Sequence, residues 1–186
     1  MNIELDLITA CINRERRAEY ELYKLTYSYL MSICIRYTNN KEEAEEVLNT
    51  GFLKILSNLT KYRTEIPFKT WMRKVMVNTL IDAYRKEKSR NGQIKYVENY
   101  VETSDFSDVN NALTKMNAEQ IYTMIKLLPP MSQKVFNLYA IDGFAHKEIA
   151  EMLDMSEGTS KWHLSFSRQQ LKEMITKMVP QKKVAS

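Results

Sequence analysis

The sequence predicts an all-α fold in which two small helical domains are joined by a flexible linker, the second domain containing a helix-turn-helix. Three observations lead to this prediction. The 186 residues include only four glycines and four prolines, so helices can run long and hairpins are scarce. Apolar residues recur at helical spacing, whereas alternating strand patterns are hard to find. The composition changes once, in a polar stretch near the middle of the chain.

The first predicted domain, residues 1–88, begins with two helical stretches. Their apolar residues are spaced three or four positions apart: Leu5, Ile8 and Ile12, then Ala18, Leu22, Leu25 and Tyr29. The next helix lies in NKEEAEEVLNTGFLKILSNL, where Asn39 or Asn40 can cap the N-terminus and acidic residues in the first turn suit the helix dipole. Its buried stripe is expected to be Val47, Leu48, Phe52, Ile55, Leu56 and Leu59.

The stretch KYRTEIPF is expected to be a loop that ends near Pro67. A helix follows from about Phe68 to Lys88, with an apolar face formed by Phe68, Met72, Val75 and Thr79. Residues 89–108 then form the predicted linker, because aliphatic residues are few and residues 97–108 contain four acids and no base. A solvated loop inside a single domain is the alternative.

The second predicted domain covers residues 109–180, and residues 181–186 form a tail. Helical spacing connects Leu113, Met116, Ile121, Met124 and Leu128. Pro129 and Pro130 should end that helix. Ser132 is expected to cap the helix in QKVFNLYAI, and Gly143 is expected to terminate it.

Residues 146–174 predict the helix-turn-helix. Ile149, Ala150 and Leu153 would face the second helix, Asp154 tolerates the left-handed turn, and Ser156 can cap the helix that follows. The inner face of the second helix is expected to be Ser160, Leu164, Ser167 and Leu171, which leaves Lys161, Trp162, Ser165 and Phe166 pointing outward. Such a helix can enter a DNA major groove. A plain helical corner is one alternative, and packing of Trp162 and Phe166 on another helix is a second.

Basic residues gather in two places, although the net charge of the chain is only +4. Six basic residues face two acids in residues 157–186, which supplies affinity for phosphate. Residues 69–95 contain eight basic residues against two acids, interleaved or flanked by Tyr62, Phe68, Trp71 and Tyr84. Cations and aromatic rings together suit a separated DNA strand, because unstacked bases need flat partners. The alternative is a solvated basic face with Phe68 and Trp71 in the core.

The sequence argues against an enzyme. It has no nucleophile motif, P-loop or dinucleotide fingerprint, and its only histidines, His146 and His163, are expected to be polar surface residues. Cys11 and Cys34 lack metal-knuckle spacing, so no metal or other cofactor is expected and a reduced, cytoplasmic setting fits best. No apolar run is long enough for insertion into a membrane.

With these motifs in place, the chain resembles bacterial RNA polymerase sigma factors of the extracytoplasmic-function type, which contain only the second and fourth sigma domains. NKEEAEEVLNTGFLKILSNL resembles the core-binding part of the second domain, and FKTWMRKVMVNTLIDAYRK the promoter-melting part. LPPMSQKVFNLYAIDGFAHKEIAEML and SEGTSKWHLSFSRQQL resemble the fourth domain. The resemblance implies a transcription initiation factor that binds core RNA polymerase and promoter DNA, and that is held by an anti-sigma factor.

The resemblance also implies three sets of site residues. Core polymerase would be bound through Glu46, Asn49 and Thr50, where the family prefers Asp, Gln and Glu. The −10 element would be captured by the loop Tyr62–Lys69 and the helix behind it: Tyr62, Arg63, Thr64, Phe68, Lys69, Trp71 and Asn78. The −35 element would be read by Lys161, Trp162, Ser165, Phe166 and Arg168, although the family often has Ser at 162 and Arg near 166.

Two other readings stay open on sequence grounds. A helix-turn-helix regulator would bind duplex DNA as a dimer without polymerase, and would need a dimerisation or effector domain in residues 1–100. A helical adaptor with no role on DNA would lack salt-dependent DNA binding.

Overall fold

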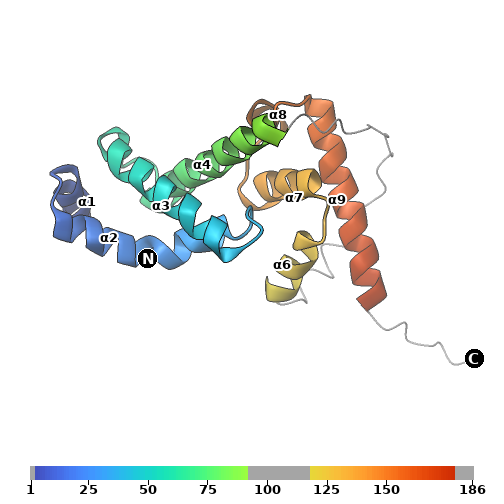
Figure 1. Ribbon diagram of the computed structural model, residues 1–186, viewed down its shortest axis with the longest axis horizontal. Coiled ribbons are helices and arrows are strands. Elements are labelled where there is room, and N and C mark those ends of the chain that lie inside the picture. Colours follow the sequence, from blue (N-terminus) through green and yellow to red (C-terminus); the bar gives the residue numbers. More distant parts are fainter. Residues whose placement is uncertain (1–2, 92–117, 179–186) are drawn as a thin grey trace, which may run out of the picture. The chain divides into compact units, whose positions relative to one another are not determined.

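The computed structural model describes residues 3–91 and 118–178, and within these ranges it contains helices and no strands (Figure 1). The chain divides into two compact units, Met1–Ile94 and Lys95–Ser186. Most of the predicted linker, the whole predicted tail, and the predicted helical residues Leu113 and Met116 lie outside the described residues. The helix expected to end at Lys88 continues to Asn91.

The first unit consists of α1 (Leu5–Ile12), α2 (Arg16–Cys34), α3 (Lys41–Asn58), the short 3-10 turn η1 (Leu59–Lys61) and α4 (Phe68–Asn91). α2, α3 and α4 pack against one another, and α1 packs on α2. Fully buried side chains from all three long helices form the core: Leu22, Leu30, Ile33, Leu48, Ile55, Met72 and Met76. In α1 the predicted stripe is only partly correct, since Ile8 is buried but Leu5 is 58% exposed.

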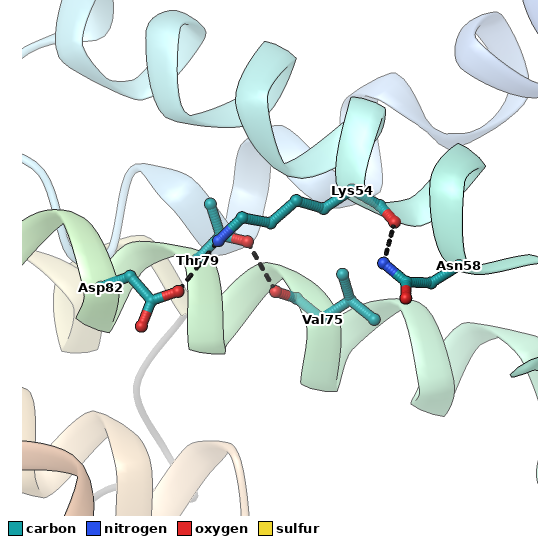
Figure 2. Close-up of polar contacts among 5 residues, drawn as sticks. All are labelled: Lys54, Asn58, Val75, Thr79 and Asp82. Atoms are coloured by element: carbon teal, nitrogen blue, oxygen red, sulfur yellow. Dashed lines mark hydrogen bonds and ion pairs between the residues drawn. The ribbon is translucent and has the colours of Figure 1, made fainter.

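The pairing of α3 with α4 depends on a small residue and one surface contact. Gly51 lies so close to α4 that a Cβ atom there would meet the Met76 side chain. At the edge of the same pair, the Lys54 ammonium donates to Asp82 over 2.9 Å, and Thr79 Oγ1 donates to the carbonyl of Val75 (Figure 2). The ion pair is exposed and contributes little to stability. The buried side chains of α3 and α4 therefore contribute more to this pairing than the ion pair does.

Both cysteines lie in the core of the first unit. Cys11 on α1 and Cys34 on α2 are free thiols, and the Cys34 Sγ contacts Met76 Sδ at 3.5 Å. Burial raises the pKa of Cys11 to about 11 and that of Cys34 to about 12.

The second unit consists of α6 (Ala118–Lys126), α7 (Pro130–Phe136), the π-helical turn η2 (Asn137–Ile141), α8 (His146–Leu153) and α9 (Glu157–Met178). α9 packs against α6, α7 and α8. Gly143 has a φ of +79°, the left-handed conformation predicted for a terminating glycine. Phe144 N–H donates to the carbonyl of Leu138 over 2.9 Å, which closes the turn between η2 and α8.

Two sequence predictions about this unit are wrong, and the two residues concerned contact each other. Ser132 does not cap a helix, because α7 already begins at Pro130, and His163 is not on the surface, because only 3% of it is exposed. The two residues instead bond to each other, with Ser132 Oγ and His163 Nδ1 2.9 Å apart. Ser167 Oγ adds a 3.0 Å hydrogen bond to the Ser132 carbonyl. This buried polar network joins α7 to α9.

Candidate functional site

The outer face of α3 presents the three residues expected to bind polymerase. Glu46, Asn49 and Thr50 are all exposed, and their spacing places them on one side of the helix. The Tyr23 hydroxyl on α2 donates to Asn49 Oδ1 over 3.1 Å, which orients the amide. We refer to Glu46, Asn49, Thr50 and Leu53 as the α3 outer face.

Leu53 belongs to this face and was missed by the sequence patterns. It lies one turn beyond Asn49 and is 64% exposed. The predicted buried stripe of α3 ran on either side of it, through Phe52 and Ile55, which are indeed buried. A large aliphatic residue that falls off the stripe is the signal that could have found it.

Three aromatic residues form the aromatic cluster: Tyr62, which follows η1, and Phe68 and Trp71 in the first turn of α4. The Tyr62 ring lies 4.9 Å from Phe68 and 5.5 Å from Trp71, and Phe68 stacks on Trp71 at 5.6 Å with 20° between the planes. The Tyr62 hydroxyl donates to the carbonyl of Ile66 and so closes the loop. Phe68 is buried, whereas Tyr62 and Trp71 are half-buried, so part of each remains exposed.

The other residues expected at the −10 element divide into two places. Arg63, Thr64 and Lys69 are exposed beside the aromatic cluster. Asn78 is also exposed, but it follows Trp71 by seven residues, about 10 Å along the helix axis. One base cannot touch both, so the cluster and Asn78 would contact different nucleotides.

Tyr29 on α2 organises the cations next to the aromatic cluster. Its hydroxyl donates to the Lys69 carbonyl over 3.3 Å and accepts from Arg73 Nε over 3.2 Å. The Lys69 ammonium lies 4.6 Å from the centre of the Tyr29 ring. Arg73 is one of the eight basic residues counted in residues 69–95, whereas the sequence placed Tyr29 only in the apolar stripe of its helix.

The helix-turn-helix has the geometry expected from the sequence. Asp154 adopts a left-handed conformation, with φ 54° and ψ 60°, between α8 and α9. The Thr159 backbone N–H donates to Ser156 Oγ over 2.9 Å, so Ser156 caps α9. The predicted inner face of α9 is buried throughout: Ser160, Leu164, Ser167 and Leu171.

The outer face of α9 carries the five residues expected to read the −35 element. Lys161 is exposed, and its 4.0 Å contact with Glu157 is too long and too solvated to hold it. Trp162 stacks on Phe166 with ring centres 5.3 Å apart and 18° between the planes. Both aromatic residues are half-buried, as is Ser165. Trp162 Nε1 is buried without an acceptor. The two rings therefore form one stacked pair that is partly exposed.

Arg168 lies at the edge of this face, beside a second aromatic contact. Its guanidinium carbon is 5.9 Å from the centre of the Tyr139 ring, and Tyr139 stacks on His146 at 4.5 Å. His146 Nδ1 also contacts Ser160 Oγ at 2.9 Å. Burial, Lys161 and Arg168 lower the pKa of His146 below its ordinary value, so the imidazole is neutral at pH 7.

We expect the stability of the second unit to fall as the pH drops below about 6.5, the ordinary pKa of histidine. A lowered pKa for His146 in the fold means that the unfolded chain binds a proton more readily, so stability is present at higher pH and is lost on acidification. Urea unfolding from pH 7.5 to 5.5 checks this, with Trp162 fluorescence as the reporter in a Trp71→Phe background. His146→Gln should flatten the pH dependence, and an unchanged slope would contradict the prediction.

The described ranges, 3–91 and 118–178, contain no group of three or more His, Cys, Asp or Glu side chains placed to hold a metal ion. Within these ranges no helix is both long and apolar enough to cross a membrane.

Matches to known families account for most of this geometry. Residues 22–90 match Sigma-70 region 2, and residues 118–171 match Sigma-70, region 4. The chain belongs to the sigma-70 family. In this sigma factor, region 2 contains the α3 outer face, the aromatic cluster and Tyr29, and region 4 contains the helix-turn-helix.

Relatives across nearly the full length identify the type of sigma factor. The chain is 24% identical to RNA polymerase sigma factor YlaC of Bacillus subtilis, over 88% of this chain and 95% of the relative. It is 22% identical to the ECF RNA polymerase sigma-E factor of Escherichia coli K12, over 86% of this chain and 88% of the relative. This sigma factor is accordingly of the extracytoplasmic-function type.

The fold is similar to that of a solved sigma factor. RpoE from Bartonella quintana, solved in complex with the anti-sigma factor NepR, matches with a TM-score of 0.50 and 16% sequence identity. The match covers 86% of this chain and 96% of that one. At this identity the similarity concerns the fold alone.

Proposed function

We propose that this sigma factor binds core RNA polymerase through its first unit and directs the enzyme to promoters, where the second unit reads the −35 element and the first unit captures the opened −10 strand. The observation that carries this function is the presence of regions 2 and 4 in one chain, in that order. Each region also presents exposed side chains of the appropriate chemistry.

Polymerase binding is assigned to the α3 outer face. Glu46 offers a carboxylate, Asn49 and Thr50 offer hydrogen-bonding groups, and Leu53 offers an apolar side chain that is 64% exposed. Protein interfaces commonly combine an apolar centre with polar residues at the rim, and this face offers both kinds of side chain.

The two DNA contacts use different chemistry. At the −10 element, the half-buried rings of Tyr62 and Trp71 can stack on unpaired bases while Arg63 and Lys69 meet phosphates. At the −35 element, α9 enters the major groove, where Lys161 can donate to base edges and the stacked rings of Trp162 and Phe166 can contact thymine methyl groups. The first contact requires open DNA, and the second requires a duplex.

The rival reading as a dimeric regulator is not favoured. It required a dimerisation or effector domain in residues 1–100, but residues 22–90 match sigma-70 region 2 instead. A helical adaptor without DNA contacts would leave the matched region 4 and its basic helix unexplained.

Reconstitution with core RNA polymerase tests the proposed function. Transcription of genomic DNA with core enzyme plus the protein should start at a defined set of sites that share −35 and −10 sequences. Gel shifts without core should show only weak, salt-dependent DNA binding. Tight, sequence-specific binding by the free protein, with no change in start sites, would support the regulator instead.

Leu53→Ala is expected to weaken binding to core polymerase about fivefold, or about 1 kcal/mol. The reason is that the complex of the variant buries less apolar surface, since Ala is smaller than Leu. Titration of labelled protein with core enzyme measures the change. Leu5→Ala is the matched control, since Leu5 is 58% exposed but belongs to α1 and not to the α3 outer face. Equal losses for the two variants would argue against the face.

An anti-sigma factor and a cytoplasmic location complete the proposal. The solved relative from Bartonella quintana was crystallised with such an inhibitor, which supports the same class of partner here. Affinity capture of the protein from its native host tests for the anti-sigma factor, and fractionation of the cell tests the location. An unbound and fully active cellular pool of the protein would count against the inhibitor.

A further inference from the structure

We propose that the second unit takes up a proton at His146 when it binds the −35 element, so that promoter binding strengthens as the pH falls below neutrality. The inference rests on the proposed function of the second unit. It adds a pH dependence to DNA binding and gives a role to a histidine that the sequence patterns placed among the polar surface residues.

His146 is connected to two of the residues on α9 that are assigned to the −35 element. Its Nδ1 atom lies 2.9 Å from Ser160 Oγ, and Lys161 directly follows Ser160 in the chain. Its ring stacks on Tyr139 with 4.5 Å between the ring centres and 21° between the planes. The guanidinium carbon of Arg168 lies 5.9 Å from the centre of the same Tyr139 ring. The imidazole is therefore near two cations that would contact DNA.

The surroundings of His146 oppose its protonation in the free protein. Burial contributes most to lowering its pKa, and the positive charges of Lys161 and Arg168 add to this effect. Glu157 acts in the opposite direction. All three charged residues belong to α9, and from η2, which also packs on α8, the imidazole meets the Tyr139 ring. The charged residues that follow it on α8 itself are Lys147, Glu148 and Glu151.

Binding of the −35 duplex reduces this opposition. DNA phosphates near Lys161 and Arg168 offset the positive charge that the two side chains exert on His146, so the pKa of the imidazole rises in the complex. Protonation also preserves the local contacts. The Ser160 hydroxyl can donate to a neutral ring nitrogen or accept from a protonated one, and an imidazolium stacked on Tyr139 gains a cation–π interaction.

The direction of the pH dependence follows from linkage between proton binding and DNA binding. A histidine whose pKa is higher in the complex than in the free protein binds more protons in the complex, so the affinity for DNA rises as the pH falls. Wild-type holoenzyme should bind a −35 duplex about threefold more tightly near pH 6 than near pH 7.5 on account of this residue.

His146→Gln provides the test, because Gln keeps a hydrogen-bonding side chain for Ser160 and cannot titrate. The probe is a duplex that carries the −35 element of a start site mapped with the wild-type protein and ends before the −10 element. The ratio of the affinities at the two pH values should be about threefold larger for wild-type holoenzyme than for the variant, since the polymerase's own pH dependence is common to both. Lys147→Gln is the matched control: Lys147 is exposed beside His146, and its variant should keep the wild-type ratio.

Lys161→Gln tests whether a DNA-binding cation mediates the effect. This variant should bind more weakly and should also show a smaller ratio than wild type, because one of the charges that DNA offsets is already absent. Equal ratios for wild type and His146→Gln, or an unchanged ratio for Lys161→Gln, would overturn the inference. If His146→Gln fails to fold, the ratio for Lys161→Gln decides alone. If wild-type holoenzyme does not prefer the −35 duplex to a scrambled one at either pH, the proposed function is what fails.

Discussion

Trp162→Ala is expected to lower transcription from promoters that depend on the −35 element by about 5- to 150-fold. This range corresponds to about 1–3 kcal/mol, the usual loss when one specific contact to a base is removed. The structure supports a large effect, because Trp162 and Phe166 are stacked and losing one ring also exposes the other. Promoter assays with wild-type and altered −35 sequences measure the change, and the variant should discriminate less between them.

A conservative variant separates base contact from folding. Trp162→Phe keeps an aromatic ring on Phe166 and deletes the indole N–H that is buried without an acceptor, so the stability of the second unit should be unchanged or slightly higher. Its −35 preference should nevertheless change, because the ring edge is different. If Trp162→Ala instead unfolds the second unit, Trp162 is a core residue and the assignment of a base contact is wrong.

Asn78→Ala is expected to reduce open-complex formation about tenfold while leaving core binding intact. The side chain is exposed on α4, so its removal creates no cavity, and its amide can both donate to and accept from a base edge. That contact forms only after a base has left the stack, a step that costs a few kcal/mol. Permanganate reactivity of −10 thymines and the yield of abortive transcripts report the loss.

A premelted template tests whether Asn78 acts at this step. Mismatches across the −10 region remove the unpairing cost and should restore part of the activity of Asn78→Ala. Asn39→Ala serves as a matched control, because Asn39 is also an exposed Asn but lies before α3. A fall in thermal stability and core binding, without rescue by premelting, would show that Asn78 supports the helix.

The sequence predicts best those features, such as helix caps and turns, that depend only on residues close together in the chain. Asn40 was one of two candidate caps for α3, and its Oδ1 accepts from the Glu43 N–H over 2.8 Å. Ser156 caps α9, and Asp154 and Gly143 occupy left-handed conformations that few other residues tolerate. In each case the residue's own chemistry and one neighbouring turn fix the outcome.

The predictions fail where the partner is distant in the chain. Ser132 has the composition of a cap, but its hydroxyl contacts His163, 31 residues later, and that contact also takes His163 into the core. Tyr29 could not be identified for the same reason, since its partners are on α4. Leu53 is different, because its position off the predicted buried stripe of α3 could have identified it from the sequence. Helical periodicity identifies the faces of a helix, and tertiary packing decides what each face meets.

The two buried thiols allow the unfolding of the first unit to be followed by their alkylation. Alkylating reagents attack thiolates, and with pKa values of about 11 and about 12 almost no thiolate exists at neutral pH while Cys11 and Cys34 stay buried. Both cysteines lie in the first unit and the sequence contains no others. The rate of alkylation of the chain therefore measures the opening of the first unit. Slower alkylation in the presence of core enzyme would record, without any engineered label, how far the complex suppresses that opening.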